Sequence, residues 1–184
     1  MTSTAYGLSD WLTYITRAEV DFLKKLACGL PDNPVVINIG AGCGTSGLAF
    51  IESRKDLYLV TIDIQKESHP YGCLAGEEDE LNKSGLSFKD RYRQIHGDSK
   101  KVPWDDSLVD MVFVDDGHSY EDCTGDILAW LPRLKKGGII AIDDYNKPLW
   151  DKPWVGVTLA VNDILLGKYE LIGTVGKVIA FRNA

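Results

Sequence analysis

The chain has 184 residues, 45% of them hydrophobic and 26% charged, and a formal net charge of −7 at pH 7. This length and composition predict one globular domain, residues 1–184, with enough apolar residues for a core. The acidic balance argues against nucleic acid or an anionic membrane as a partner, because both require a basic surface.

A helical segment within residues 1–30 is predicted to precede the first strand. Thr16 and Glu19 form a capping-box pattern, and apolar residues then recur at helical spacing until Gly29. The remainder of the chain, residues 35–184, alternates apolar runs of strand length with helical patterns.

A glycine-rich loop follows the first predicted strand, residues 35–39. The loop, Gly40-Ala-Gly-Cys-Gly44, has glycine at every second position, and Thr45 and Ser46 come next and are predicted to cap a helix over residues 46–54. This pattern indicates a buried parallel strand, a turn whose backbone approaches a ligand, and a helix N-terminus directed at that ligand. A tight turn without a ligand is the alternative, which the glycine content of the loop disfavours.

A carboxylate ends the second predicted strand, residues 57–62. Asp63 lies nineteen residues after Gly44, where such folds bind the hydroxyls of a ribose; a solvated loop acid is the alternative. Residues 65–91 show little organisation, and we interpret the acidic run Glu77–Glu80 as a solvated helix face.

Three further strands, two helices and a hairpin are predicted beyond residue 91. The strands cover residues 92–96, 109–114 and 139–142, the helices cover 120–134 and 157–166, and the hairpin pairs 169–173 with 177–181. Lys135 and Lys136 are expected at the C-terminus of the first of these helices, which Gly137 and Gly138 would end. The fold class is therefore α/β: a Rossmann-like, doubly wound, mostly parallel seven-stranded sheet with a C-terminal antiparallel hairpin.

Ligands of such sheets bind beyond the carboxyl ends of the strands. The polar segments that follow the predicted strands should therefore meet along one edge. These segments are residues 38–44, Asp63, Asp98, residues 115–118 and residues 143–144.

Three carboxylates are expected to lie together at this edge. Asp115, Asp143 and Asp144 follow two neighbouring strands, and carboxylates crowded in this way repel one another unless a cation such as Mg²⁺ binds them. The alternative is that some of them are helix caps or solvated loop acids, a description that fits Asp116. His118 lies beside the predicted metal site and is the candidate general base.

The glycine loop alone does not decide the cofactor. The pattern Gly42-x-Gly44-x-x-Gly47, followed by Asp63, also satisfies the dinucleotide fingerprint of NAD-binding proteins. The three carboxylates weigh against NAD, because they have no role in hydride transfer.

No targeting or membrane segment is predicted. The first eleven residues lack a basic start followed by an apolar stretch, and no run approaches the length of a membrane span. The cysteines, at positions 28, 43, 73 and 123, form no CxxC pair, which argues against a zinc site or a disulfide framework. We expect a cytoplasmic protein with reduced thiols and no membrane partner.

From residue 35 onward the chain resembles the class I S-adenosylmethionine-dependent methyltransferases, and among them the small metal-dependent O-methyltransferases. Residues 38–44 resemble the family's acid-x-Gly-x-Gly-x-Gly loop, with Asn38 in the place of the usual acid. Residues 113–120 and 143–145 resemble a subgroup that includes macrolide-sugar O-methyltransferases and cephalosporin-biosynthesis methyltransferase-like proteins. The Asp143–Asp144 pair stands where Asp–Asn or Glu–Asp is commoner.

The resemblance implies a role for each of these residues. S-adenosylmethionine would be bound by Asn38, Gly40, Ala41, Gly42, Gly44, Thr45, Ser46, Asp63, Ile64, Asp98, Ser99 and Asp115. Mg²⁺ would be held by Asp115, Asp143 and Asp144, with His118 and Asp115 as the catalytic residues. The implied partner is a small-molecule hydroxyl acceptor, and Tyr145, Trp150 and Trp154 either line its pocket or pack a loop.

Three other functions stay open at this point. They are metal-independent methyl transfer, NAD-dependent oxidoreduction, and a non-catalytic cofactor-binding or interaction domain. The exposed edge of the C-terminal hairpin also makes a homo-oligomer an option.

Overall fold

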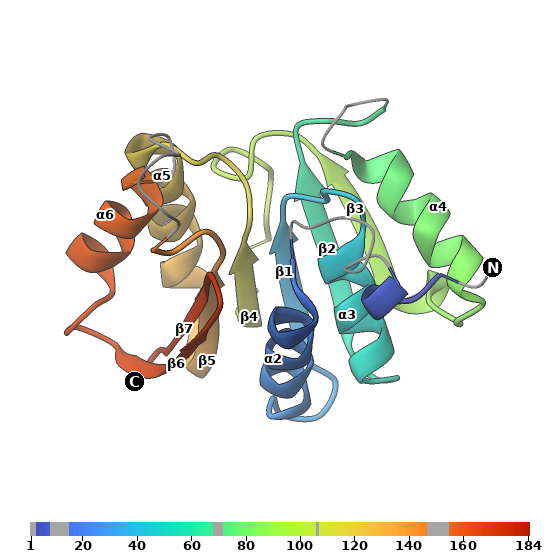
Figure 1. Ribbon diagram of the computed structural model, residues 1–184, viewed down its shortest axis with the longest axis horizontal. Helices are drawn as coiled ribbons and strands as arrows, with labels where there is room; N and C mark the ends of the chain where they lie inside the picture. Colours follow the sequence, from blue (N-terminus) through green and yellow to red (C-terminus); the bar gives the residue numbers. More distant parts are fainter. Residues whose placement is uncertain (1–2, 8–14, 68–71, 106, 147–154) are drawn as a thin grey trace.

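Seven strands form one sheet in the order β3-β2-β1-β4-β5-β7-β6 (Figure 1). The strands are β1 (Val35–Ile39), β2 (Tyr58–Asp63), β3 (Tyr92–His96), β4 (Val109–Val114), β5 (Leu134–Ile142), β6 (Glu170–Val175) and β7 (Val178–Arg182). The first five pair in parallel, whereas β7 pairs antiparallel with both β5 and β6. The computed structural model describes residues 3–7, 15–67, 72–105, 107–146 and 155–184. The predicted fold class is confirmed.

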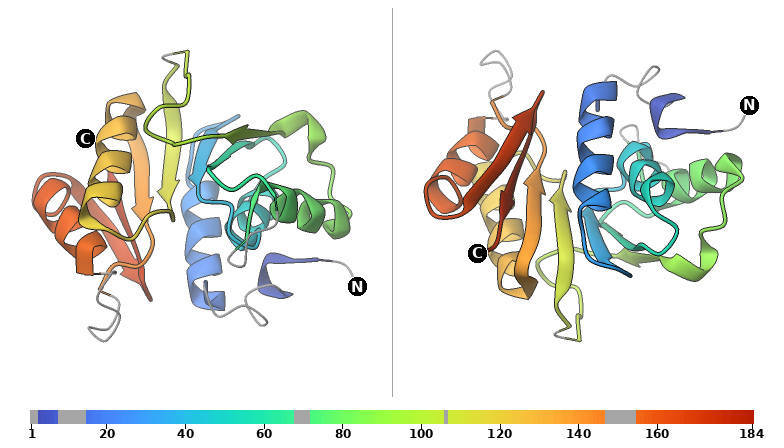
Figure 2. Two further views of the ribbon diagram at one scale, coloured as in Figure 1. Left: turned by 90° about the horizontal axis from the view of Figure 1, so that it is seen from above. Right: turned by 90° about the horizontal axis from the view of Figure 1, so that it is seen from below.

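Helices cover both faces of the sheet (Figure 2). The helices are α2 (Arg17–Cys28), α3 (Thr45–Ser53), α4 (Leu74–Ser84), α5 (Tyr120–Trp130) and α6 (Val155–Ile164). Side chains of β1 alternate between the two faces: Val36 packs with residues of α2, α3 and α4, whereas Ile37 and Ile39 pack with residues of α5 and α6. Within the described ranges, none of these helices combines the length and the apolar character that crossing a bilayer requires.

The capping box predicted at the start of α2 is present and has a second function. The side chain of Thr16 accepts a hydrogen bond from the Glu19 N–H, and Oε2 of Glu19 accepts one from the Thr16 N–H. Glu19 is fully buried, and its other oxygen, Oε1, accepts a hydrogen bond of 2.7 Å from the Lys177 N–H. One carboxylate therefore both caps α2 and binds the turn between β6 and β7.

The expected cap of α3 is wrong by one residue. Thr45 and Ser46 lie inside the helix and are buried, and the N-cap is Gly44, at φ +85°, with no side-chain hydrogen bond. The loop needs a left-handed residue directly before the helix, and glycine adopts that conformation without steric cost. The cap residue therefore supplies no side-chain hydrogen bond to the first N–H groups of α3.

The expected end of α5 is also wrong. The helix stops at Trp130, because Pro132 has no N–H group and converts the next turn to a 3₁₀ helix, Leu131–Arg133. Residues 134–138 belong to β5, whose pairing with β4 is irregular near Val109, so Lys135 and Lys136 lie in a strand and not at the C-terminus of α5. Lys135 instead binds both oxygens of the buried Asp110 carboxylate, at 2.9 and 3.0 Å. The apolar residues Ile127, Leu128, Leu131 and Leu134 predict one buried helix face, but Leu128 is 56% exposed.

Candidate active site

The segments that follow five strands are joined by backbone hydrogen bonds along one edge of the sheet. In spatial order, the Gly97 N–H bonds to Asp63, the Gly40 N–H to Ile62, the Asp115 N–H to Ile39 and the Asp143 N–H to Val114, at 2.8–3.0 Å. The order of the strands reverses between β1 and β4, which is where doubly wound sheets bind ligands. The convergence expected from the sequence is confirmed.

The glycine loop crosses directly over the end of β4. Gly40 has φ +93°, and a Cβ atom there would overlap the backbone carbonyl oxygen of Asp115. Gly42 has φ +48° and nothing within 4 Å of a Cβ position. Position 40 therefore accepts only glycine, whereas position 42 has room for a side chain.

Asp63 holds the glycine loop in place. Its Oδ2 accepts a hydrogen bond of 2.8 Å from the Ala41 N–H, and its Oδ1 accepts one of 2.6 Å from the Gln65 N–H. Each carboxylate oxygen still has a lone pair for a further donor. Ile64, the next residue, is 50% exposed at the same edge. The role of Asp63 in fixing the loop was not predicted.

Asp98 and Ser99 follow β3 and are already engaged by the protein. The carboxylate of Asp98 binds the side chains of Lys101, at 3.0 Å, and Lys100, at 3.1 Å, and these contacts lower its pKa to about 2. The hydroxyl of Ser99 is buried and donates to Asp126. Burial raises the pKa of Asp126 to about 6. These contacts fix the loop of Asp98 and Ser99, for which the family resemblance implies contact with S-adenosylmethionine.

A buried acid lies beneath the glycine loop and contacts Asn38. Glu77, on α4, is fully buried, so its interpretation as part of a solvated helix face is wrong. Its Oε1 accepts hydrogen bonds from the amide of Asn38, at 3.3 Å, and the hydroxyl of Thr61, at 3.1 Å, and its Oε2 accepts one from the hydroxyl of Tyr92, at 2.7 Å. A Cβ atom at Gly47 would overlap Oε1. Gly47 thus makes room for Glu77, a structural reason for the last glycine of the fingerprint.

Replacing Glu77 by Gln is expected to stabilise the protein more at pH 8 than at pH 5. Burial raises the pKa of Glu77 from its ordinary value of 4.5 to about 7. As the pH rises from 4.5 to above 7, the unfolded chain loses this proton first, so the folded state loses up to about 3 kcal/mol of stability. The Gln side chain does not titrate, and its amide can donate to Oδ1 of Asn38, which has no hydrogen-bond partner within the described residues.

Urea unfolding at the two pH values measures this difference. Glu78→Gln is the matched control, because Glu78 is the next residue on α4 and is exposed. A stability gain of Glu77→Gln that is equal at pH 5 and pH 8 would contradict the raised pKa of Glu77.

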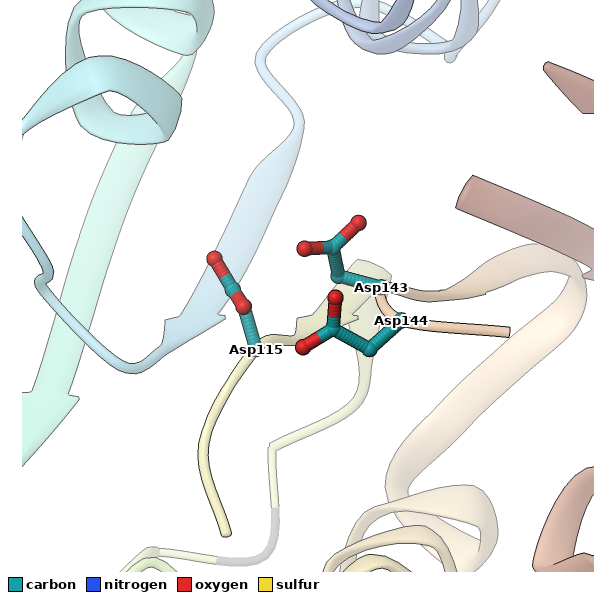
Figure 3. A group of neighbouring side chains, drawn as sticks. All are labelled: Asp115, Asp143 and Asp144. Atoms are coloured by element: carbon teal, nitrogen blue, oxygen red, sulfur yellow. The ribbon is translucent and has the colours of Figure 1, made fainter. Parts of the chain in front are cut away.

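The three carboxylates predicted to bind a metal lie together (Figure 3). Oxygens of Asp115, Asp143 and Asp144 all lie within 4.8 Å of one another. Asp143 and Asp144 are buried and Asp115 is partly exposed. Burial, and then the neighbouring charges of Asp143 and Asp144, raise the pKa of Asp115 well above its ordinary value. Asp144 adopts a left-handed backbone conformation, at φ +59°, which is uncommon for a residue with a side chain and is typical of functional sites.

His118 also lies at this cluster. Its Nδ1 is 3.3 Å from Oδ2 of Asp144, and its side chain is 35% exposed. The carboxylate orients the imidazole ring. The pairing of a partly exposed histidine with a buried carboxylate is suited to accepting a proton from a ligand.

Lys177 is the member of the site that the sequence analysis missed. It lies in the turn before β7, and its Nζ is 2.7 Å from Oδ1 of Asp144 and 3.1 Å from Oδ2 of Asp143. Because β7 runs antiparallel to β5, the residue before β7 lies beside the carboxyl end of β5. That relation was available from the predicted hairpin and would have pointed to Lys177.

The donor set suits a hard divalent cation. Carboxylate oxygens are the ligands that Mg²⁺ prefers, and three of these groups converge here. Within the described residues, Oδ1 of Asp143 is buried and receives no hydrogen bond. A cation would satisfy this oxygen, so the residues present fit a metal site.

One of the three aromatic residues proposed for a substrate pocket, Tyr145, packs against α6. The hydroxyl of Tyr145 donates to Asn162 of α6 at 3.1 Å, so this side chain packs its loop against the helix. Trp150 and Trp154 lie outside the described residues.

Comparisons with known proteins agree with this arrangement. Residues 37–145 match a protein family described as a methyltransferase domain. An uncharacterised protein of Acanthamoeba polyphaga mimivirus is 28% identical in an alignment of 154 positions, and the match covers 76% of this chain and 64% of that protein's length.

Several solved structures share the fold. A protein described as a putative caffeoyl-CoA O-methyltransferase from Staphylococcus aureus is 17% identical, with a TM-score of 0.74 over 98% of this chain and 92% of that one. The TDP-rhamnose 3′-O-methyltransferase CalS11 of calicheamicin biosynthesis is 19% identical, with a TM-score of 0.67 over 95% and 85%. The methyltransferase PaMTH1 of Podospora anserina, solved with S-adenosylhomocysteine (SAH), is 18% identical, with a TM-score of 0.71 over 98% and 86%.

Proposed function

Because this chain belongs to the methyltransferase domain family, we propose that it transfers the methyl group of S-adenosylmethionine to a hydroxyl oxygen of a small molecule, assisted by a divalent cation. The observation that carries the proposal is the position of Asp115. Its backbone lies against the glycine loop, and its side chain belongs to the acidic cluster. Cofactor and acceptor would thus meet on the two sides of one residue.

The cofactor would lie along the glycine loop and the neighbouring strand ends. The N-terminus of α3, which has no side-chain cap, suits the carboxylate of the methionine part, because the N–H groups of a first helical turn and the helix dipole attract an anion. Asp63 retains lone pairs for the ribose hydroxyls and already positions the loop. Glu77 provides a carboxyl group beneath the loop in place of the acid that is absent at position 38.

The acceptor hydroxyl would lie beside the acidic cluster. Asp115, Asp143 and Asp144 would hold the cation, which lowers the pKa of a bound hydroxyl and fixes its orientation. His118, oriented by Asp144, would take the hydroxyl proton. The oxygen would then attack the methyl carbon in line as the bond from carbon to sulfur breaks, leaving SAH. Positioning and electrostatic stabilisation would supply most of the acceleration.

A small hydroxylated acceptor fits the charge and the proposed cation of the site. The net charge of −7 disfavours a nucleic acid, and a cation held by three clustered carboxylates suits a ligand with two neighbouring oxygens. The sugar named as the substrate of CalS11 supports this class of acceptor.

Calorimetric titration with SAH, followed by turnover assays with polyhydroxylated and phenolic acceptors, tests the proposal. We expect one SAH molecule to bind per chain, and turnover to be lost in EDTA and restored by Mg²⁺. Turnover that survives EDTA would favour metal-independent transfer. A folded, ligand-free sample that does not bind SAH would overturn the proposal.

A further inference from the structure

The acidic cluster contains a cation of its own, the ammonium group of Lys177. We propose that Lys177 is a built-in counter-ion that stabilises the cluster before a divalent cation binds and weakens the binding of that cation. This inference rests on the proposed cation site and concerns the affinity of that site for a divalent cation.

The backbone of Lys177 is fixed from two sides. Its N–H donates to Oε1 of the buried Glu19 at 2.7 Å, and its carbonyl oxygen accepts a hydrogen bond of 2.9 Å from the Tyr145 N–H. Gly176, before it, has φ +56°, and a Cβ atom there would overlap the Glu19 carboxylate. The turn is therefore built closely around Glu19, which directs the lysine side chain to the end of β5.

The ammonium group uses only part of the cluster. It binds Oδ2 of Asp143 and Oδ1 of Asp144, whereas Oδ1 of Asp143 receives no hydrogen bond within the described residues, although Asp143 is only 4% exposed. The Nζ atom lies 3.1 Å from Asp143 and 2.7 Å from Asp144, which are the distances of charge-assisted hydrogen bonds between an ammonium group and carboxylates.

One ammonium group does not balance three carboxylates. The cluster keeps an excess of negative charge and a buried oxygen without a donor, which together attract a divalent cation. A cation bound there would lie close to the ammonium, and the repulsion between them would be weakly screened in this buried setting. The lysine therefore has two opposite effects: it stabilises the empty cluster and destabilises the occupied one.

Lys177→Met tests both effects, because methionine keeps the unbranched stem and removes the charge. We expect Mn²⁺, measured by electron paramagnetic resonance, to bind this variant at least about tenfold more tightly than the wild type. In EDTA the variant should melt at a lower temperature than the wild type, and Mn²⁺ should raise its melting temperature by a larger amount.

Three other variants complete the test. Lys177→Gln can still donate to the carboxylates and should also bind Mn²⁺ more tightly, which covers the case in which the methionine variant does not fold. Lys177→Arg keeps the charge and should bind Mn²⁺ with an affinity close to that of the wild type. Lys136→Met, at an exposed lysine of β5, should change neither property.

The outcomes separate this inference from the proposed function. If the neutral variants bind Mn²⁺ no more tightly than the wild type, the counter-ion role is overturned and the cation site stands. If no form of the protein binds Mn²⁺, both the cation site and the counter-ion role are overturned. Titration with SAH, made without metal, then shows whether the cofactor part of the proposed function survives.

Discussion

Asp115→Asn is expected to reduce methyl transfer at least about a hundredfold while raising the stability of the cation-free protein. The substitution removes a proposed ligand of the cation and would prevent the acceptor from being positioned and activated. It also removes a carboxylate whose ionisation is opposed by burial and by Asp143 and Asp144. At pH 8, where this group would be ionised in the unfolded chain, the neutral side chain should therefore favour the folded state.

Turnover, SAH binding and thermal unfolding in EDTA together measure these effects. SAH affinity should stay close to that of the wild type, because the substitution leaves the backbone beneath the glycine loop unchanged. Asp90→Asn, at an exposed position before β3, is the control and should change none of the three properties. Wild-type turnover by Asp115→Asn would exclude the proposed mechanism, and a parallel loss of activity, SAH binding and stability would indicate a structural role instead.

Gly40→Ala is expected to destabilise the protein by about 3 kcal/mol or more and to abolish SAH binding. Its backbone is left-handed, and the added Cβ atom would overlap the carbonyl oxygen of Asp115, which belongs to the backbone and cannot rotate away. Relief of this overlap would separate the ends of β1 and β4. The hydrogen bonds that join Gly40 to Ile62 and Asp115 to Ile39 would then be lost or weakened.

Gly42→Ala is the matched control in the same loop. Its Cβ atom would meet nothing within 4 Å, and its φ of +48° lies in the region that other residues enter at a cost of about 1 kcal/mol. Urea unfolding of the two variants should therefore separate them clearly. Equal stability losses in Gly40→Ala and Gly42→Ala would show that the backbone of Asp115 leaves room for a side chain at position 40.

The methyltransferase resemblance and the Rossmann-like sheet were predicted from the sequence and are confirmed. The glycine loop and Asp63 are also brought to one edge, together with the acidic cluster, as expected. The reason is that each prediction rests on a short pattern followed by one topological rule. Apolar runs predict buried strands, and parallel strands place their carboxyl ends at one edge. The binding of S-adenosylmethionine by individual residues stays a prediction.

The wrong predictions of helix ends have local causes. At each end two sequence signals competed, and the prediction followed the weaker one. Two signals competed at α3, the hydroxyl residues and the glycine before them, and the need for a left-handed residue placed the cap at Gly44. At α5, Pro132 ended the helix before the lysines and glycines that were expected to end it. In both cases backbone stereochemistry outweighed side-chain preference.

By itself, the sequence determined the order of the strands along the chain, the shape of the glycine loop and the carboxylates at the strand ends, because each depends on neighbouring residues. Only the tertiary structure decided that Glu77 is buried beneath the glycine loop and that Glu19 fixes the backbone of Lys177. Glu77 is buried beneath a loop more than thirty residues before it, and Lys177 is held by Glu19, 158 residues away. Such contacts arise when a charged group is buried and must be paired, and the partner is selected by packing in space rather than by distance along the chain.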